Sequence, residues 1–327
     1  GIPSTDHLTL ESIKTSHPVI PLLLEYREVN KLISTYINGI MKYVKGDRIY
    51  PQFHQISHDH AATLSGRLAS SNPNFQNIPN RTDRGKLIRK AFIPTEGYTL
   101  IKGDYAQLEL MVMAHFSQDA NMLEAYRNGG DLHTHTSLLP VFQRRANPRF
   151  DAKTTNFSII YGAEPKTLSE RLGCSIEEGK EIRAAIFETY PGIKKWIDGT
   201  RNFASKDGYT ESLFGRRRSC PLVHSDKWGE KEGAYREAVN HPIQSTAADI
   251  CKLGMIDFYN TYKPFIDNGD MFIIGQVHDE ILIEVKTGLE DWSDNLKQSM
   301  EIINPLCIPL KAEMATGPNW AEMEKLG

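Results

Sequence analysis

Cysteine is scarce in this chain, and long apolar runs are missing. The 327 residues include four cysteines, Cys174, Cys220, Cys251 and Cys307, and no CxxC pair. This scatter fits free thiols in a reducing compartment better than a disulfide framework or a zinc site. No segment approaches the roughly 18 apolar residues of a membrane-spanning helix, and the first residues lack a signal-peptide pattern. We therefore expect no membrane partner and a cytoplasmic or nucleoid location, with an organellar or viral context left open.

Acidic and basic residues are nearly balanced, with 38 Lys and Arg against 41 Asp and Glu. The hydrophobic share of 40% and the charged share of 24% exclude disordered, collagen-like and coiled-coil classes. The length predicts two or three packed units. Net charge argues against a polyanionic partner, but cations cluster locally, either as solvated faces or as a phosphate-binding surface. The clusters are Arg81, Arg84, Lys86, Arg89 and Lys90; Arg144, Arg145 and Arg149; and Arg216, Arg217 and Arg218.

The hydrophobic patterns predict an α+β fold, because helices and strands do not alternate regularly. An amphipathic helix is expected over 18–40, with a broad apolar face that includes Leu22 and Tyr26. Residues 118–240 are predicted to be mostly helical. Strands are expected at 98–104, 271–277, 281–285 and within 307–317, with helices following Asp104 and over 291–305. The strands at 271–277 and 281–285 would form a tight hairpin with an acidic tip.

Two aspartates occupy positions that suit a metal site. Asp104 ends one apolar strand and Asp279 lies in the predicted hairpin turn. If their strands are neighbours in one sheet, the two carboxylates would face a common ligand. Mg²⁺ typically takes one or two protein carboxylates together with substrate phosphates. The alternative for each aspartate is a turn residue or a helix cap.

A second pattern lies in the helix expected to begin after Asn147, with Asn147 as the cap and Pro148 at the first position. Cations and then aromatic residues recur at every fourth position, which places them in one stripe on the helix. The stripe consists of Arg149, Lys153, Phe157 and Tyr161. It could hold the phosphates of a nucleotide at one end and its base or sugar at the other. The alternative is a helix that buries its aromatics and solvates its cations.

Other polar residues lie close to these patterns. Glu109 follows Asp104 by five positions and could contact a sugar. His133 and His135 form an HxH pair without a further ligand at a familiar spacing, so a phosphate contact by His133 is favoured over zinc. His278 and Glu280 flank Asp279, where the alternative is an exposed polar turn.

Several ordered motifs then converge on one family. They are SGRLASSNPNFQNIPNRTDRGKLIRKAF, GDYAQLELMVMAHFSQD, RFDAKTTNFSIIYG, TESLFGRRRS, HPIQSTAADI and QVHDEILIEV. With these motifs, the sequence resembles the polymerase domain of family A DNA polymerases, from about Ser4 to Trp320. The resemblance implies a right-hand polymerase fold with an antiparallel palm sheet, helical fingers and a partial helical thumb. It also implies template-directed addition of deoxynucleotides to a primer 3′ end, with primer-template DNA and deoxynucleoside triphosphates as partners.

The resemblance further implies a division of the chain into 1–58 as a partial thumb, 59–117 as the first part of the palm, 118–239 as the fingers and 240–327 as the second part of the palm. Family members have a longer thumb and usually an exonuclease-like domain before it. The expectation is therefore a fragment that begins partway through the thumb, without proofreading or 5′ nuclease domains in this chain.

Residue by residue, Asp104 and Asp279 resemble the family's two metal-binding aspartates, with the backbone carbonyl of Tyr105 completing the site. The implied cofactor is a pair of Mg²⁺ ions, for which Mn²⁺ can substitute. Lys153 would donate a proton to the departing pyrophosphate. Glu280 resembles an additional acidic residue near the primer terminus.

The same carry-over assigns the nucleotide and DNA contacts. Arg149, Lys153 and His133 match the residues that hold the triphosphate, and Glu109 matches the steric gate against a 2′-hydroxyl, with Tyr161 as its partner. Phe157 matches the residue beside the sugar's 3′ side, where Phe implies poor use of dideoxynucleotides. Tyr105 and Gln107 complete the nucleotide set. The primer-template set is Arg67, Asn74, Gln76, Arg236, Asn240, Gln244 and His278, which would test base-pair shape mainly through the minor groove.

The chain departs from the family's usual residues at Ala106, Met111, Phe150, Ser158 and Ser245, which puts primer grip, fidelity and rate in doubt. Three other functions were weighed. An RNA-templated or ribonucleotide-incorporating polymerase shares the metal chemistry, but Glu109 and Tyr161 argue against ribonucleotides. A silent nucleic-acid-binding module would not need the intact set of aspartates and cations. A metabolic enzyme that uses nucleoside triphosphates would not need the minor-groove set.

Overall fold

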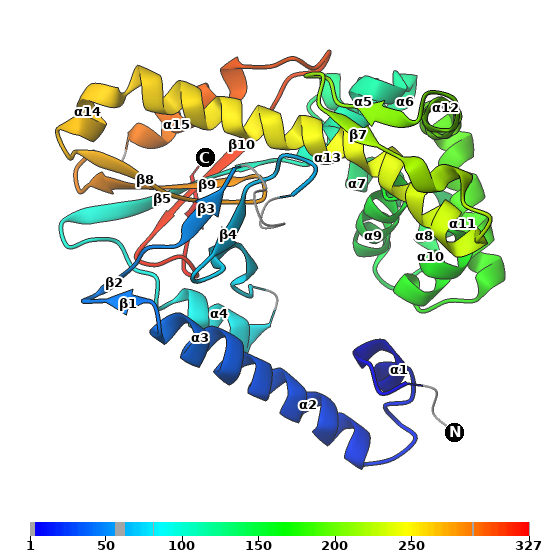
Figure 1. Ribbon diagram of the computed structural model, residues 1–327, viewed down its shortest axis with the longest axis horizontal. Coiled ribbons are helices and arrows are strands. Elements are labelled where there is room, and N and C mark those ends of the chain that lie inside the picture. Colours follow the sequence, from blue (N-terminus) through cyan, green and yellow to red (C-terminus); the bar gives the residue numbers. More distant parts are fainter. Residues whose placement is uncertain (1–3, 56–62, 81, 290, 327) are drawn as a thin grey trace.

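An antiparallel sheet of five strands organises one part of the molecule in the computed structural model, which describes residues 4–55, 63–80, 82–289 and 291–326 (Figure 1). The strand order is β11-β10-β5-β9-β8. The strands are β5 (Tyr98–Tyr105), β8 (Met271–Val277), β9 (Glu280–Lys286), β10 (Ala312–Gly317) and β11 (Glu324–Lys325). The predicted strands 98–104 and 271–277 and the predicted α+β class are confirmed; the final strand is shorter than 307–317.

Alternation along β5 assigns its two faces. Ile101, Gly103 and Tyr105 face the helices α13 (Trp228–Thr261) and α15 (Trp292–Ile302), which lie across this side of the sheet in Figure 1. A Cβ on Gly103 would lie 2.5 Å from the Sδ of Met300, so the packing here is close and a larger residue would require Met300 to shift. Asp104, the next residue along the strand, therefore points to the opposite face.

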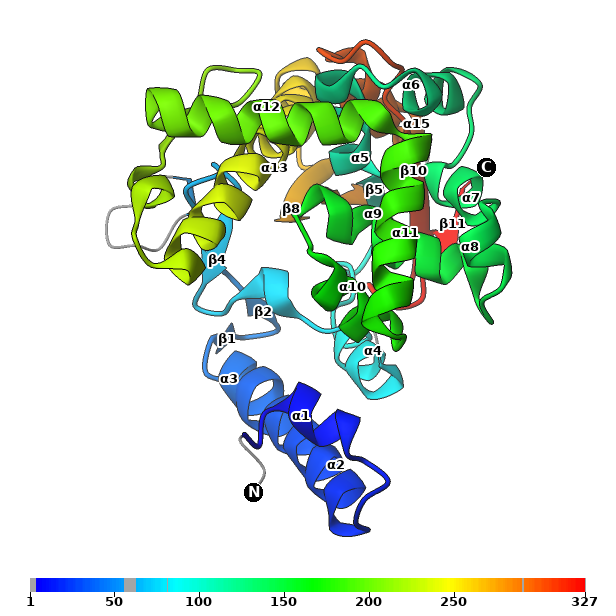
Figure 2. The ribbon, with the colours of Figure 1, turned by 90° about the vertical axis from the view of Figure 1, so that its right-hand side faces the viewer.

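Eight helices connect β5 to the rest of the chain and form the second part of the molecule (Figures 1 and 2). They are α5 (Leu108–Ser117), α6 (Ala120–Arg127), α7 (Leu132–Ser137), α8 (Pro140–Gln143), α9 (Pro148–Ile160), α10 (Pro165–Leu172), α11 (Ile176–Thr189) and α12 (Pro191–Asp207). Side chains of Asp119, Asp131 and Ser175 accept backbone hydrogen bonds at the N-termini of α6, α7 and α11. The helical prediction for this region is therefore confirmed in its main part.

A short hairpin, absent from that prediction, interrupts the helices. It consists of β6 (Tyr209–Glu211) and β7 (Arg217–Ser219), followed by the 3-10 turn η3 (Pro221–His224). The long helix α13 then runs from this region back over the sheet, and α14 (Lys263–Asp267) leads into β8. Because α13 is continuous through residues 239 and 240, the predicted boundary there falls inside one helix. The division into domains stays a prediction.

The N-terminal region extends away from the sheet over residues 7–41 in both views, whereas its residues 69–77 return to the sheet, where Gln76 donates to the Gln276 carbonyl (Figures 1 and 2). Its elements are α1 (His7–Ser12), α2 (Val19–Lys31), the wider helical turns η1 (Leu32–Ile37), α3 (Asn38–Met41), β1 (Val44–Lys45), β2 (Arg48–Ile49), β3 (Gln52–His54), β4 (Ala69–Ser71), the 3-10 turn η2 (Phe75–Asn77) and α4 (Asp83–Arg89). The helix predicted over 18–40 is confirmed. Leu22 and Tyr26, on its predicted apolar face, are exposed, whereas Ile20 and Leu24 are buried.

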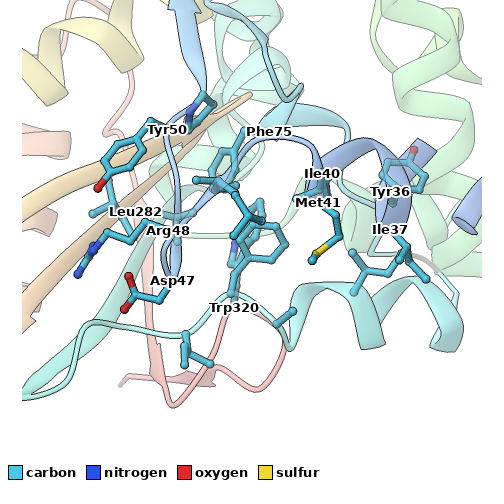
Figure 3. A pocket seen from close by; sticks show the side chains of 18 of the residues that line it. Tyr36, Ile37, Ile40, Met41, Asp47, Arg48, Tyr50, Phe75, Leu282 and Trp320 are labelled. Atoms are coloured by element: carbon cyan, nitrogen blue, oxygen red, sulfur yellow. The ribbon is translucent and has the colours of Figure 1, made fainter. Parts of the chain in front are cut away.

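An apolar cavity of about 1200 Å³ separates the N-terminal helical segment, α2 to α3, from the sheet and the C-terminal segment (Figure 3). Tyr36, Ile37 and Met41 line it from the helix, and Leu282 lines it from β9. Trp320 lines it from the C-terminal segment and stacks on Phe75 with ring centroids 4.7 Å apart. The cavity adjoins the same face of the sheet as Asp104, but its lining is mainly apolar.

The cysteines and the helices bear on two expectations from the sequence, free thiols and no membrane-spanning helix. All four cysteines are free thiols, as predicted. Within the described ranges, no helix combines the length and the apolar composition needed to cross a bilayer.

We expect that Gly254→Ala destabilises the protein, because α13 passes Tyr105 and α15 too closely for a side chain. A Cβ at this position would lie 2.6 Å from the Tyr105 hydroxyl and 3.2 Å from the Met300 Cα. Such overpacking costs about 1–3 kcal/mol. Denaturant unfolding measures the loss. The matched control is Gly199→Ala in α12, where no atom lies within 4 Å of the new Cβ and stability should rise slightly. Equal effects of the two substitutions would contradict the packing argument.

Candidate functional site

The two predicted metal aspartates lie on adjacent segments. Asp104 lies near the end of β5, and Asp279 lies in the two-residue turn between β8 and β9. The backbone N–H of Tyr105 donates to the carbonyl of Asp279 at 3.2 Å. His278, the other turn residue, has a positive φ of 59°, which gives the hairpin its tight reversal. The predicted hairpin and the predicted pairing of strands are therefore confirmed.

Burial and neighbouring carboxylates raise the proton affinity of both aspartates. Burial raises the pKa of Asp104 to about 6, and the charge of Glu280 adds to the effect. Burial also raises the pKa of Asp279 to about 7, with Asp104 as the next cause. Ionising two partly buried carboxylates on adjacent segments is electrostatically unfavourable, so a divalent cation with oxygen ligands fits this site.

Besides the two aspartates, few protein groups are placed to bind a metal at this site. Within the described ranges, no group of three or more His, Cys, Asp or Glu side chains is arranged to hold a metal. The side chain of Tyr105 points to the opposite face of the sheet, where its hydroxyl donates to the Met300 carbonyl at 2.7 Å. Only the backbone of Tyr105 is therefore available for the predicted ligand role. A pair of aspartates suits Mg²⁺, which usually keeps several waters.

Glu280 is engaged by other protein groups. The indole Nε1 of Trp320 donates to its Oε1 at 2.7 Å, and Lys102 Nζ lies 3.3 Å from its Oε2. The guanidinium of Arg89 lies over the Trp320 ring, 4.0 Å from its centroid. Glu280 is therefore buried and fixed, not part of an exposed polar turn. Sequence reasoning missed Trp320, because its partner lies forty positions away and no local pattern links them.

The predicted stripe lies on α9. Asn147 and Pro148 occupy the N-cap and the first helical position as expected, but the Asn147 side chain accepts no capping hydrogen bond. Arg149 and Lys153 are exposed, whereas Phe157 is partly buried against the main core. Tyr161 follows the last residue of α9 and is also partly buried. The stripe thus has an outward cationic end and an inward aromatic end.

Glu109 joins the first turn of α5 to this stripe. It is buried, its Oε2 accepts a hydrogen bond from the Tyr161 hydroxyl, and its Oε1 forms an ion pair with Arg67. Burial and the Glu109 charge raise the pKa of Tyr161, which therefore stays protonated as the donor. The structure brings together three residues that the sequence placed in the gate, its partner and the DNA-contact set.

His133 lies beneath the stripe and is almost fully buried. Burial lowers its pKa to about 4, an effect that Asp131 opposes and that Lys153 and Arg149 reinforce. Its Nδ1 lies 3.1 Å from the amide nitrogen of Asn156. His135 points elsewhere and contacts the Tyr190 hydroxyl at 2.8 Å. The two histidines therefore do not form a metal site, in agreement with the sequence analysis.

The predicted primer-template residues do not gather at one point. Asn74 caps η2, and Gln76 donates to the carbonyl of Gln276 at 3.2 Å beside the sheet. Arg236 and Asn240 instead line a cavity of about 520 Å³ between the end of α9 and α13. The remaining three are Arg67 beside Glu109, the half-buried Gln244 on α13 and the exposed His278 in the hairpin turn.

Most cations of the three basic clusters are paired with carboxylates. In the triplet, Arg216 pairs with Asp249, Arg217 with Glu211 and Arg218 with Glu237. The other pairs are Arg84–Glu25, Lys86–Asp83, Lys90–Glu322, Arg144–Glu181, Arg145–Asp151 and Arg149–Asp131. Arg81 lies outside the described residues. The clusters therefore carry less uncompensated positive charge than the sequence alone indicates.

Ser158, one of the residues at which the chain departs from the family's usual sequence, forms hydrogen bonds with its neighbours. Ser158 on α9 accepts a hydrogen bond from Arg171 of α10 at 2.8 Å and donates to the Thr154 carbonyl at 2.6 Å. A glycine at this position could not accept the bond, so Ser158 adds a link between α9 and α10.

We expect Asp279→Asn to stabilise the protein in metal-free buffer at pH 8. The raised pKa values mean that ionising these carboxyls costs stability as pH rises from about 4 to about 7. The gain should be about 2–4 °C in melting temperature, roughly 1 kcal/mol, and should vanish near pH 4, where both carboxyls are protonated.

Thermal melts with a chelator present measure this effect. Asp198→Asn is the control, because Asp198 is exposed and forms an ordinary ion pair with Lys194. If Asp279→Asn melts below the wild type at pH 8, the ionisation of Asp279 does not reduce the stability of the folded protein.

Comparisons with known proteins agree with this geometry. The model of the DNA polymerase family A matches residues 1–322. The chain is 38% identical to the thermostable DNA polymerase I of Thermus filiformis and 41% identical to DNA polymerase I of Deinococcus radiodurans, covering 99% and 98% of this chain. It spans only 39% and 33% of those relatives' own lengths.

A solved structure, the POL domain of Pol1 from M. smegmatis in complex with DNA primer-template and dNTP, is also similar. Its TM-score is 0.89 at 36% identity, over 97% of this chain and 56% of that one. The match in fold and sequence extends over nearly the whole chain and includes both aspartate-bearing segments. The chain belongs to DNA polymerase family A.

Proposed function

We propose that this chain catalyses template-directed addition of deoxynucleotides to a primer 3′ end. The observation that carries the proposal is the pair of partly buried aspartates, Asp104 and Asp279, on adjacent segments of the sheet, each with a raised pKa. Family membership gives this pair its reaction class. The similar solved domain is in complex with DNA primer-template and dNTP, which supports the same partners for this chain.

Asp104 and Asp279 would hold Mg²⁺, together with the backbone carbonyl of Tyr105. When bound, two such ions supply a lowered pKa for the attacking 3′-hydroxyl and stabilise charge on the phosphates. Lys153 is exposed on α9 and is proposed to protonate the leaving pyrophosphate. Glu280, fixed by Trp320 and Lys102, would act beside the primer terminus without moving far.

The stripe on α9 is proposed to bind the nucleotide. Arg149 and Lys153 would hold the phosphates, and Phe157 and Tyr161 would contact the sugar and base. His133, Tyr105 and Gln107 complete the nucleotide set. In this scheme α5–α12 are the fingers, the five-stranded sheet is the palm, and α1–α3 belong to the thumb.

Glu109 is proposed as the gate against ribonucleotides. Its carboxylate is buried and held by Arg67 and Tyr161, so it could not move aside cheaply for a 2′-hydroxyl. DNA contacts are proposed for Arg67, Asn74, Gln76, Gln244 and His278. Arg236 and Asn240 are proposed to contact DNA at the cavity beside Tyr161, where the buried Oδ1 of Asn240 has no partner among the described residues.

Primer extension tests the proposal directly. The wild-type chain should extend a labelled primer on a DNA template with Mg²⁺ and deoxynucleotides. Asp279→Asn should reduce the rate by about 10³-fold or more, because metal-assisted charge stabilisation contributes several kcal/mol. This variant is expected to be at least as stable as the wild type, so its inactivity would not reflect unfolding. Binding of primed DNA without extension by the wild type would favour the silent module.

A second measurement tests the gate. Glu109→Ala should raise the incorporation of ribonucleotides relative to deoxynucleotides by about 10-fold or more, because the side chain that excludes the 2′-hydroxyl is removed. Single-nucleotide insertion with paired substrates gives the ratio. Glu124→Ala is the control, since this carboxylate is exposed on α6 and joins none of the ion pairs among the described residues. Equal use of both sugars by the wild type would favour the ribonucleotide alternative.

A further inference from the structure

Asp131, which precedes α7, is surrounded by hydrogen-bond donors. The backbone N–H of His133 donates to its Oδ1 at 3.0 Å, and the Thr134 hydroxyl donates to its Oδ2 at 2.8 Å. The amide of Gln107, from the start of α5, also donates to Oδ1. Burial raises the pKa of Asp131, but these bonds and those from Arg149 outweigh it and lower the pKa to about 2. The carboxylate is therefore charged at neutral pH.

The Nε–Nη2 edge of the Arg149 guanidinium faces the Asp131 carboxylate. Its Nε and Nη2 lie 3.0 and 2.5 Å from the same Oδ2 of Asp131, and Nε is also 3.2 Å from the Thr134 hydroxyl. This edge of a guanidinium is one that grips two oxygens of a phosphate. Lys153, one turn further along α9, is exposed and joins none of the ion pairs among the described residues.

The Arg149–Asp131 ion pair can break without leaving either side chain buried and unpaired. The side chain of Arg149 is 63% exposed and that of Asp131 is 27% exposed, so water screens the attraction. If Arg149 leaves, Asp131 keeps its bonds from His133, Thr134 and Gln107. Exposed pairs of this kind contribute little, equivalent to at most about a fivefold change in an equilibrium constant.

We propose that Asp131 is a built-in competitor of the nucleotide: its carboxylate occupies the phosphate-binding edge of Arg149 and is displaced from it by the triphosphate. This inference rests on the proposed function, in which α9 holds the triphosphate. Both anions need the same N–H groups, so they cannot occupy this edge together. Asp131 is thus a positioning residue that weakens nucleotide binding while it keeps Arg149 ordered and links α7 to Gln107.

Single-turnover primer extension separates the nucleotide dissociation constant from the maximal rate. Asp131→Asn removes the charge but keeps an acceptor for the N-terminus of α7. We expect it to lower the dissociation constant for the correct deoxynucleotide about two- to fivefold, without raising the maximal rate. Asp131→Ser retains the cap but is too short to reach Arg149, and should give the same direction.

The matched control is Glu181→Gln. It neutralises a comparable exposed pair, with Arg144 at 2.6 Å, on a side chain outside the stripe. Its dissociation constant should equal that of the wild type, which excludes a general effect of net charge. Unchanged or weaker nucleotide binding in both variants at position 131 would overturn the inference.

Calorimetric titration with tripolyphosphate reads the same competition without DNA synthesis. Tighter binding by Asp131→Asn than by the wild type would support the inference, and equal or weaker binding would overturn it. A wild-type chain that extends no primer would contradict the proposed function alone, since the polyphosphate measurement still decides the role of Asp131.

Discussion

The partial burial of two carboxylates, Asp104 and Asp279, on adjacent segments is the constraint on which the site depends. A folded chain holds two such groups together only if the surrounding structure compensates elsewhere. Here the compensation comes from the register of β5 with β9 and from the apolar packing of Ile101 and Tyr105 against α13 and α15. The close approach at Gly103 and Gly254 allows that packing. Stability on one face of the sheet thus supports an unfavourable arrangement on the other.

Two carboxylates connect the start of α5, which follows β5, to α9. Glu109 contacts Arg67 and Tyr161, and Asp131 contacts Gln107 and Arg149. Each carboxylate therefore bridges the start of α5 to a residue at one end of α9. A movement of α9 relative to α5 would break or re-form these contacts.

Charge in this molecule is more local than its composition implies. Most cations of the basic clusters form ion pairs with neighbouring carboxylates, as Arg216, Arg217 and Arg218 do. A polyanion that binds here must compete with internal carboxylates or use the remaining exposed cations such as Lys153. Such competition favours ligands that also offer shape and metal contacts over ligands that offer charge alone.

The sequence by itself determined the element types near the site, the tight hairpin around Asp279 and the stripe on α9. These features depend on residues a few positions apart, whose periodicity and turn chemistry are local. The family motifs likewise predicted the residues of the site. Only the tertiary structure decided the partners: Trp320 on Glu280, Asp131 on Arg149, and the carboxylates on the basic clusters. It also showed that the Asn147 side chain accepts no hydrogen bond at the N-terminus of α9. These contacts join residues distant in the chain, and their existence depends on how whole elements pack, which local patterns do not encode.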